Sequence, residues 1–524
     1  MRRECAGGDK STGTGGVKGT TTVGTKATKA VGITVAKAMP RKKPRFAVIG
    51  AGMAGILSAI KLKELGCTNY AIYEKAGRLG GTWRENTYPG VACDVPAHLY
   101  SYSFAPNPDW SHVFAGGNEL QCYFEDIAQR YGVASEVRYG TEIDRLEWAG
   151  GKWHLHASNG VAGEADVVIA ATGVLHHPAY PDIEGLGTFH GPAFHTARWN
   201  HSIPIKGSRI AVIGTGSSAV QVVSELVHQG ADTFVFQRTP QWILAFDNTP
   251  YTEEERSTYR SQPAVMAAMR DQIRDTFEKN FANAVVDANS PEVKVLEELC
   301  RTNLETHVQD PVLREHLRPA YRAACKRLIL SPYFYDAIQQ DNAHLVTERI
   351  ACVEPAGIRT ADGTLHEVDA IVLATGFRVD QFIRPAEVIG RNGIKLNDLW
   401  AKRPAAYMAL SVPDMPNLFL LNGPNGPVGN FSLIDVAELQ FSYVMQALDP
   451  IVNGPYREVS AKREAHDRFE ADRVEASKKT IWVTGCKSWY LDDRGIPAVW
   501  PWNFDHFRES MAKPLMEDYE LVAG

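Results

Sequence analysis

The 524-residue sequence predicts an α/β protein with two Rossmann-like dinucleotide-binding domains and a helical insertion in the second domain. Three observations support this fold class. A glycine-rich turn between an apolar run and a helical pattern occurs twice, within 46–74 and 209–238. Two further apolar runs end in Ala-Thr-Gly, at 171–173 and 374–376. The stretch of about 251–325 is charged and helix-periodic, with prolines as punctuation.

Composition is that of an ordinary soluble protein, with 44% hydrophobic and 22% charged residues. A formal net charge of −6 gives no reason to expect nucleic acid as a partner. No run reaches about 18 apolar residues, so we expect no transmembrane helix and no membrane association. The eight cysteines include no C-x-x-C pair, which argues against a metal site, a dithiol redox motif and a disulfide framework. We therefore expect reduced, mostly structural cysteines in a cytoplasmic protein.

Residues 1–43 form a basic tail rich in Gly, Thr and Lys, with Glu4 and Asp9 as its acids. Such a segment buries too little apolar surface to offset its ordering entropy, so we predict disorder. It lacks the apolar centre of a secretory signal. An organellar transit peptide is a weaker alternative, because no amphipathic arginine-bearing helix is evident. Met39 is an alternative start, and the sequence leaves open whether residues 1–38 belong to the mature protein.

The first glycine turn, Gly50–Gly55, follows a short apolar run that is typical of a buried parallel strand. In the G-x-G-x-x-G pattern, the glycines allow a tight turn, close approach of a pyrophosphate and close packing of the following helix. Glu74 ends the next strand, where an acid hydrogen-bonds a ribose 2′-hydroxyl. The whole unit predicts a dinucleotide site with contacts from Gly50, Gly52, Gly55 and Glu74.

A loop punctuated by glycine and proline follows from Gly80 to Asp94 and carries aromatic residues. The isoalloxazine ring of a flavin needs a broad apolar wall, whereas a nicotinamide alone does not. We therefore assign FAD to the first site, with further contacts from Gly81, Thr82, Trp83 and Asp94. Taken alone, Asp94 would more often be a turn residue or a helix cap than a catalytic group.

The second glycine turn, Gly214–Ala219, belongs to another strand–turn–helix–strand unit, with alanine replacing the third glycine. Its second strand ends at Arg238 rather than at an acid. Arginine attracts the 2′-phosphate that an acid would repel, so this site suits NADPH; the alternative is a solvated strand-end cation. Two such sites indicate hydride transfer between cofactors in a flavin oxidoreductase. The predicted contacts are Gly214, Gly216, Ser217, Ser218, Arg238 and Thr239.

The chain then returns to the flavin domain. Asp369–Phe377 reads as a closing strand of the nicotinamide domain, and Leu418–Asn425 as a strand and turn that meet the flavin ring. The aromatic-rich C-terminal part is expected to cover the site. The predicted divisions are 44–188 for the first part of the FAD-binding domain, 189–200 for an interdomain linker, 201–385 for the NADPH-binding domain, and 386–524 for the second part of the FAD-binding domain with its C-terminal cover.

Two longer patterns resemble those of the Baeyer–Villiger monooxygenases, which are class B flavin-dependent monooxygenases. The pattern F-x-G-x-x-x-H-x-x-x-W is met by Phe189, Gly191, His195 and Trp199, while Asn200 stands where the family has Pro or Asp. The pattern G-G-x-W-x-x-x-x-[FY]-P-G-x-x-x-D is met in full from Gly80 to Asp94. The resemblance covers about residues 44–510.

The resemblance implies an NADPH- and O2-dependent enzyme that inserts one oxygen atom next to a ketone carbonyl, giving an ester or lactone. It implies that Arg327 stabilises a flavin peroxide and that Asp94 holds Arg327 by a charge-assisted pair. Arg238, Thr239 and Lys326 match the residues that hold the 2′-phosphate of NADPH. Trp489 matches a tryptophan near the nicotinamide end. For His195 we expect hydrogen bonding that couples domain position to NADP occupancy, rather than proton transfer.

The sequence leaves other functions open. An N- or S-oxygenating flavin monooxygenase shares both turns, but Trp199 and the Asp94/Arg327 pair favour Baeyer–Villiger chemistry. A disulfide reductase is disfavoured by the missing cysteine pair. A non-catalytic redox sensor predicts bound FAD without multiple turnovers. The sequence does not identify the ketone, the regiochemistry or the oligomeric state, for which a monomer is the default.

Overall fold

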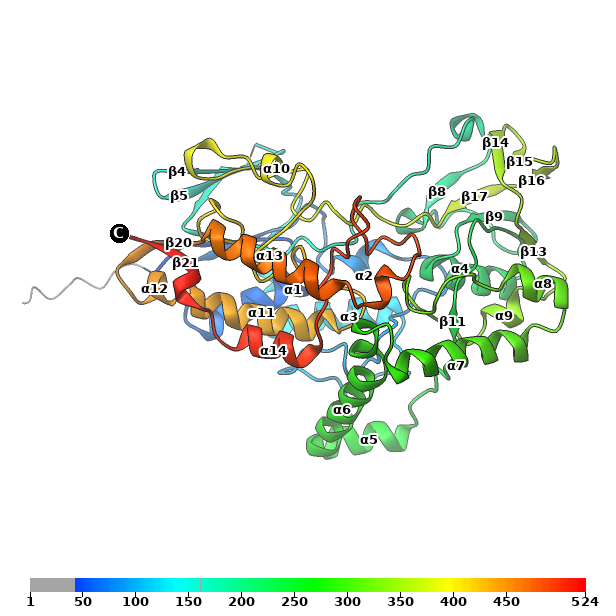
Figure 1. Ribbon diagram of the computed structural model, residues 1–524, viewed down its shortest axis with the longest axis horizontal. Helices are drawn as coiled ribbons and strands as arrows, with labels where there is room; N and C mark the ends of the chain where they lie inside the picture. The colour runs from blue at the N-terminus through cyan, green and yellow to red at the C-terminus, as the bar shows by residue number, and fades with distance from the viewer. Residues whose placement is uncertain (1–42, 161) are drawn as a thin grey trace, which may run out of the picture. The chain divides into compact units, whose positions relative to one another are not determined.

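Two parallel five-stranded sheets, each leading into one of the glycine turns, organise the chain (Figure 1). The structure is a computed structural model and describes residues 43–160 and 162–524. The predicted tail up to residue 42 and the alternative start at Met39 lie outside the described residues. The predicted α/β class with two dinucleotide-binding units is confirmed.

The first sheet has the strand order β19-β7-β1-β2-β3, and all its neighbouring strands are parallel. β1, β7 and β19 are buried along their whole length, as expected of a parallel sheet covered on both faces. β19 pairs with β7 although it lies far along the chain, so the chain does return to this sheet. The bounds are β1 Phe46–Ile49, β2 Tyr70–Tyr73, β3 Val137–Arg138, β7 Val167–Ala170 and β19 Leu418–Leu420, with helices α1 Met53–Glu64 and α3 Gly117–Arg130.

The second sheet has the order β13-β10-β9-β17-β8 and is also parallel throughout. Its edge strand β8 comes from the predicted interdomain linker 189–200, so part of that stretch is built into the sheet. The helix after the second glycine turn is α4. The bounds are β8 Ala193–His195, β9 Arg209–Ile213, α4 Ser217–His228, β10 Asp232–Phe236, β13 Ala343–Val346 and β17 Ala370–Leu373.

The two ends of the helical insertion lie next to each other, because β11, which precedes it, pairs with β12, which follows it. Three of its helices, α6, α7 and α8, begin at Pro263, Pro291 and Pro311, where a missing N–H costs nothing. Arg270 on α6 forms an ion pair with Asp435, far along the chain, with an N–O distance of 2.9 Å. The bounds are β11 Ile243–Leu244, α5 Glu253–Ser261, α6 Pro263–Phe277, α7 Pro291–His307, α8 Pro311–His316 and β12 Ile329–Leu330.

The C-terminal helices α11, α13 and α14, orange to red in Figure 1, belong with the first sheet. One hydrophobic core joins α1 and β1 to residues of these helices, including the buried Phe441, Phe469 and Phe507. The bounds are α11 Leu433–Ala447, α12 Asp449–Val452, β20 Tyr456–Ala461, α13 Arg463–Ser477, α14 Phe504–Ala512 and β21 Tyr519–Ala523.

Smaller elements complete the described residues. A four-stranded sheet has the order β18-β4-β5-β6, and β14, β15 and β16 form an antiparallel sheet. The bounds are α2 Thr82–Glu85, β4 Ile143–Ala149, β5 Lys152–Ala157, β6 Ala162–Ala165, α9 Phe334–Ala337, β14 Ile350–Glu354, β15 Gly357–Thr360, β16 Leu365–Glu367, β18 Glu387–Ile389 and α10 Leu396–Leu399.

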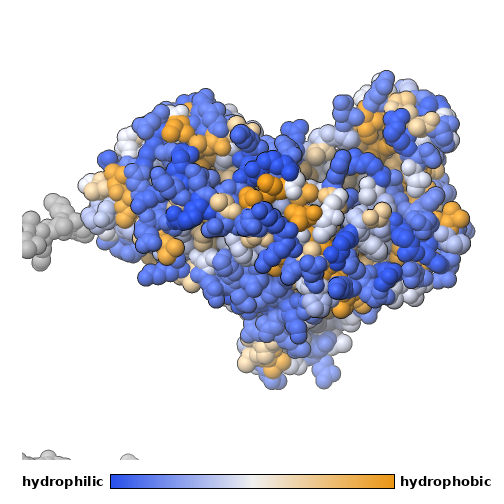
Figure 2. Space-filling view, viewed as in Figure 1, coloured by the Kyte–Doolittle hydropathy of each residue, from blue (hydrophilic) through white to orange (hydrophobic). Residues whose placement is uncertain are grey.

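Hydrophilic residues cover most of the face that Figure 2 shows, and hydrophobic residues appear there in small groups. Among the described helices, none combines the length and the apolar character that crossing a membrane requires.

The expectation that all cysteines are reduced is wrong for two of them. Cys325 and Cys486 form a disulfide between positions 161 residues apart. Motif spacing did not reveal this bond because the tertiary fold alone brings the two segments together. Cysteine usage therefore no longer argues for a reducing compartment such as the cytoplasm. Cys67, Cys93, Cys122, Cys300 and Cys352 are free thiols.

Removing this disulfide is expected to lower the free energy of unfolding by about 2–4 kcal/mol, because the bond restricts the unfolded chain. The measurement is urea unfolding of the wild type and of the Cys325→Ala/Cys486→Ala variant, each with and without a dithiol reductant. Reductant should lower the wild-type midpoint toward that of the variant and leave the variant unchanged. Cys300→Ala, which removes a buried free thiol, is the control. A wild-type midpoint insensitive to reductant would contradict the prediction.

Candidate active site

A single cavity of about 820 Å³ is lined by residues from both glycine turns. Its wall also includes the aromatic loop 80–95, the pair Lys326 and Arg327, and C-terminal residues 487–489. Segments that lie far apart in the sequence therefore meet around one space, which is large enough for more than one small ligand.

The first glycine turn needs its glycines for steric reasons. Gly50 has φ +100°, and a Cβ on Gly55 would lie 1.9 Å from the Gly50 carbonyl oxygen. Gly52 faces Gly81 so closely that a Cβ on Gly81 would lie 3.0 Å from the Gly52 Cα. Helix α1 starts after Gly52 without a side-chain cap, so its first N–H groups remain available to a ligand. These features fit a pyrophosphate cradle.

Glu74 lies at the edge of the cavity and is 4% exposed. Its carboxylate accepts a hydrogen bond from the Ala51 N–H at 2.8 Å and pairs with the Arg84 guanidinium at 3.0 Å. Arg84 also pairs with Glu85, which in turn pairs with Arg198. Burial acts to raise the pKa of Glu85, but Arg84 and Arg198 lower it by more. The pKa is therefore below its usual value, and this carboxylate stays ionised. Through its hydrogen bond with the Ala51 N–H, Glu74 stabilises the first turn and lies next to the predicted ribose position.

The second glycine turn has the same local design. Gly214 has φ +123°, and a Cβ there would lie 2.4 Å from the Ala374 carbonyl oxygen. Helix α4 starts after Gly216 without a side-chain cap. A Cβ on Gly216 would meet no atom within 4 Å, so this glycine borders open space. Ser217 and Ser218 line the cavity beside it.

Two positive charges lie near the second turn. Lys326 lines the cavity, its Nζ 4.8 Å from the centroid of the Tyr321 ring. Burial lowers the pKa of Lys326, and the nearby charge of Arg238 lowers it further. Within the described residues neither cation has an ion-pair partner, and Arg238 is exposed. The pair is therefore available to an anionic ligand.

Arg327 is held at the cavity wall by three groups. Its Nε donates to Asp94 at 3.1 Å, and its Nη2 pairs with the same carboxylate. Its Nη1 donates to the Gly429 carbonyl oxygen, and the Tyr490 hydroxyl hydrogen-bonds the guanidinium. Burial acts to lower the pKa of Arg327, but Asp94 and Tyr490 more than offset it, so the pKa is raised. The result is a permanent cation with 22% of its side chain exposed.

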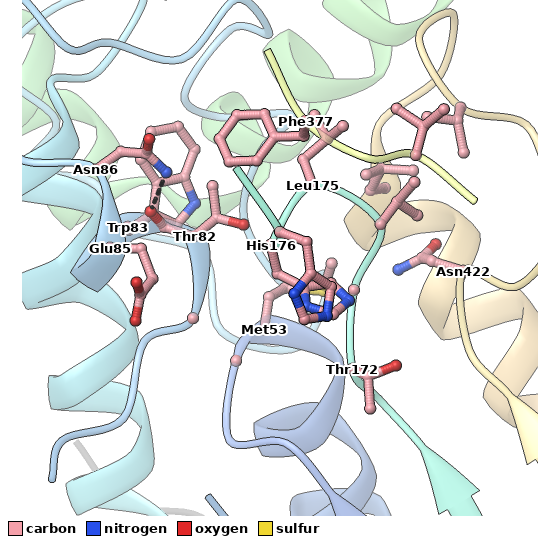
Figure 3. A pocket seen from close by; sticks show the side chains of 18 of the residues that line it. Met53, Thr82, Trp83, Glu85, Asn86, Thr172, Leu175, His176, Phe377 and Asn422 are labelled. Atoms are coloured by element: carbon pink, nitrogen blue, oxygen red, sulfur yellow. Dashed lines mark hydrogen bonds between the residues drawn. The ribbon is translucent and has the colours of Figure 1, made fainter. Parts of the chain in front are cut away.

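An apolar wall surrounds another part of the cavity (Figure 3). Trp83 packs edge-on against Tyr100, with ring centroids 5.7 Å apart. Figure 3 also shows Met53, Leu175 and Phe377 around the hollow. These three residues were missed by the motif analysis, although Leu175 and Phe377 each follow an Ala-Thr-Gly turn closely. Such turns end strands of parallel sheets, where ligands commonly bind.

His176 also lines this wall, and its Nε2 lies 2.8 Å from the Phe382 carbonyl oxygen. Burial and the neighbouring His177 lower the pKa of His176 to about 4. The ring is therefore neutral near pH 7 and donates to the carbonyl oxygen.

His195 does not line the cavity, and its ring hydrogen-bonds to the backbone at two places. It is fully buried, its Nδ1 accepts from the Ala197 N–H at 3.1 Å, and its Nε2 donates to the Gly376 carbonyl oxygen at 2.9 Å. Burial lowers its pKa, so the ring is neutral. The Gly376 carbonyl oxygen also accepts from the Ala179 N–H at 2.9 Å. His195 thus supports the place where segments 171–180 and 374–379 run side by side.

The other residues of the signature stretch are structural in this arrangement. Trp199 is 8% exposed and packs edge-on against Phe194, with ring centroids 5.2 Å apart. A Cβ on Gly191 would lie 2.5 Å from the Asp369 carbonyl oxygen, so only glycine fits. Phe189 packs against the core of the second sheet.

The structure brings most of the predicted site residues together. Those that line the cavity are Gly50, Gly52, Glu74, Gly81, Thr82, Trp83, Asp94, Gly216, Ser217, Ser218, Lys326, Arg327 and Trp489. Predicted residues outside the lining are Gly55, Gly214, Arg238, Thr239, Phe189, Gly191, His195 and Trp199. Gly429 and Tyr490 were not predicted, because nothing in the sequence links these positions to Arg327.

Known proteins resemble this chain along most of its length. A family profile described as "Pyridine nucleotide-disulphide oxidoreductase" matches residues 47–298. An uncharacterized monooxygenase of Mycobacterium tuberculosis is 44% identical over 483 residues, covering 92% of this chain and 97% of the relative. A Baeyer-Villiger monooxygenase of Streptomyces coelicolor is 37% identical over 483 residues, covering 91% and 92%.

Solved structures show the same similarity. Cyclohexanone monooxygenase from Rhodococcus sp. Phi1 bound to NADP+ superposes with a TM-score of 0.83 at 25% identity, covering 92% of this chain and 99% of the other. The OTEMO complex with FAD and NADP has a TM-score of 0.83 at 25% identity, covering 92% and 100%.

Proposed function

Because the chain belongs to the Baeyer–Villiger monooxygenase family, we propose that it uses NADPH and O2 to insert one oxygen atom next to the carbonyl of a small ketone. The product is an ester or a lactone. The observation that carries the proposal is the Arg327–Asp94 pair at the wall of a cavity that both glycine turns line.

The two glycine turns are the sites for the cofactors. The first turn, with Glu74 beside it and Trp83 in the apolar wall, suits FAD. The second turn, with Ser217, Ser218 and Lys326, suits NADPH. Bound FAD and NADPH supply the reducing equivalents and the oxygen activation that the reaction needs. The residues of the two turns and of the cavity wall contribute binding, orientation and charge.

Arg327 supplies fixed positive charge where an oxygen atom gains negative charge during the reaction. A guanidinium suits this task because it stays charged and its fork of N–H groups has a defined direction. Asp94 aligns the fork through Nε and Nη2, and the Gly429 carbonyl oxygen aligns Nη1. The partly buried position strengthens each of these interactions, because water screens them less.

The proposed function is tested by product analysis on a panel of cyclic, aryl and linear ketones, with NADPH oxidation and hydrogen peroxide followed in parallel. A tertiary amine and a sulfide are included to detect N- or S-oxygenation. We expect at least one ketone to give an ester or lactone in proportion to NADPH consumed. An N-oxide or sulfoxide as the only product would reassign the enzyme to the N- or S-oxygenating group.

A further inference from the structure

The C-terminal segment 486–490 meets the Arg327 segment at two points. Cys486 is bonded to Cys325, two residues before Arg327. Four residues after Cys486, the hydroxyl of Tyr490 hydrogen-bonds the Arg327 guanidinium. Gly429, whose carbonyl oxygen accepts from Arg327, lies at the same place, since a Cβ there would be 2.2 Å from the Tyr490 hydroxyl oxygen. Three distant parts of the chain therefore converge on one guanidinium.

We propose that Tyr490 is a positioning residue for Arg327, with its hydroxyl setting the direction in which the guanidinium points into the cavity. This inference rests on the proposed function, because it concerns the cation assigned to oxygen insertion. Tyr490 does not line the cavity, so it acts through Arg327.

The chemistry of the two groups defines the hydrogen bond. A guanidinium has only donors, so the Tyr490 oxygen is the acceptor. Burial raises the pKa of Tyr490; Arg327 opposes this and Asp94 adds to it, so the phenol keeps its proton. A neutral acceptor fixes the guanidinium without cancelling its charge. A second carboxylate at this position would fix the group and neutralise it, which the proposed reaction cannot use.

Tyr490 is itself rigid, as a positioning residue must be. It is 3% exposed, and its ring centroid lies 4.1 Å from that of Trp489 and 5.5 Å from that of Trp482. Its backbone N–H donates to the Ser488 hydroxyl at 3.2 Å, and its carbonyl oxygen accepts from the Ala498 N–H at 2.7 Å. The hydroxyl is thus held from behind by packing and by both of its own backbone groups.

The test is Tyr490→Phe, which removes the hydroxyl and keeps the packed ring. We expect ester formed per NADPH oxidised to fall about tenfold, with hydrogen peroxide rising to match, because one hydrogen bond to a charged group is lost. The effect should appear in kcat for ester formation and leave KM for NADPH unchanged. FAD content and the thermal midpoint should also stay at wild-type values.

The matched control is Tyr443→Phe, which removes another buried hydroxyl that hydrogen-bonds Tyr519 and lies outside the cavity lining. It should keep wild-type coupling between NADPH oxidation and ester formation.

Unchanged coupling in Tyr490→Phe would overturn the inference. An equal loss of coupling in Tyr443→Phe, or a loss that follows FAD content or the thermal midpoint, would also overturn it, since a structural role would then suffice. Failure of the proposed function is separate, because it would appear as wild-type enzyme that forms no ester from any ketone.

Discussion

Arg327→Ala is expected to continue oxidising NADPH while ester formation falls by about 10²- to 10³-fold. NADPH oxidation uses the nucleotide sites, whereas oxygen insertion needs fixed positive charge where negative charge develops. Removing one group that stabilises such charge typically lowers the rate by about 10²- to 10³-fold. Electrons taken from NADPH would then reach O2 without forming product, so hydrogen peroxide should account for the NADPH consumed. Ester, NADPH and peroxide are measured in the same reaction.

Two variants sharpen this experiment. Arg327→Lys keeps the charge but loses the fork that Asp94 and Gly429 align, so it should remain severely impaired. Arg322→Ala, five residues earlier and paired with Glu297, removes an arginine outside the cavity lining and should keep coupling. Ester formation near the wild-type rate in Arg327→Ala would show that Arg327 is not the catalytic cation.

Lys326→Ala and Arg238→Ala are each expected to raise KM for NADPH by about 10- to 100-fold while leaving KM for NADH nearly unchanged. Each cation offers charge-assisted hydrogen bonds to the 2′-phosphate, which NADH lacks, and such bonds are worth about 1.5–3 kcal/mol. The wild type should correspondingly reduce its flavin faster with NADPH than with NADH. Stopped-flow flavin reduction with both nucleotides provides the measurement.

Lys294→Ala serves as the control, because Lys294 is an exposed cation on α7 that does not line the cavity. Equal wild-type rates with NADPH and NADH would contradict the assignment of the second site. A rise in KM shared by both nucleotides would instead point to loss of the whole site. The lowered pKa of Lys326 predicts, in addition, weaker NADPH binding as pH rises toward that pKa, because the deprotonated amine no longer attracts phosphate.

Local signals were sufficient for both nucleotide units. At Gly50, Gly55 and Gly214, any Cβ would collide with backbone, so the glycine pattern reports the turn directly. The apolar runs before the turns form buried parallel strands, because both faces of each parallel sheet are covered. The Baeyer–Villiger resemblance, which depends on such motifs, is confirmed by the relatives.

Long-range contacts were not predictable in this way. The sequence predicted only a linker at 189–200. It could not predict β8 within that stretch, because β8 pairs with β17, whose residues lie far along the chain. The cysteine prediction failed at Cys325 and Cys486 for the same reason. The roles of the individual site residues, including Arg327 and Lys326, stay predictions for the experiments above.

The sequence by itself determined the two glycine turns, the residue types available for chemistry and the family. Short-range sterics and the spacing of motifs carry that information within a few residues. Only the tertiary structure decided that Arg327 meets Gly429 and Tyr490 in addition to Asp94, the partner that the resemblance implied, and that His195 hydrogen-bonds Gly376. The physical reason is that these contacts depend on how separate segments pack, and a buried hydrogen bond between them leaves no periodic trace in the chain.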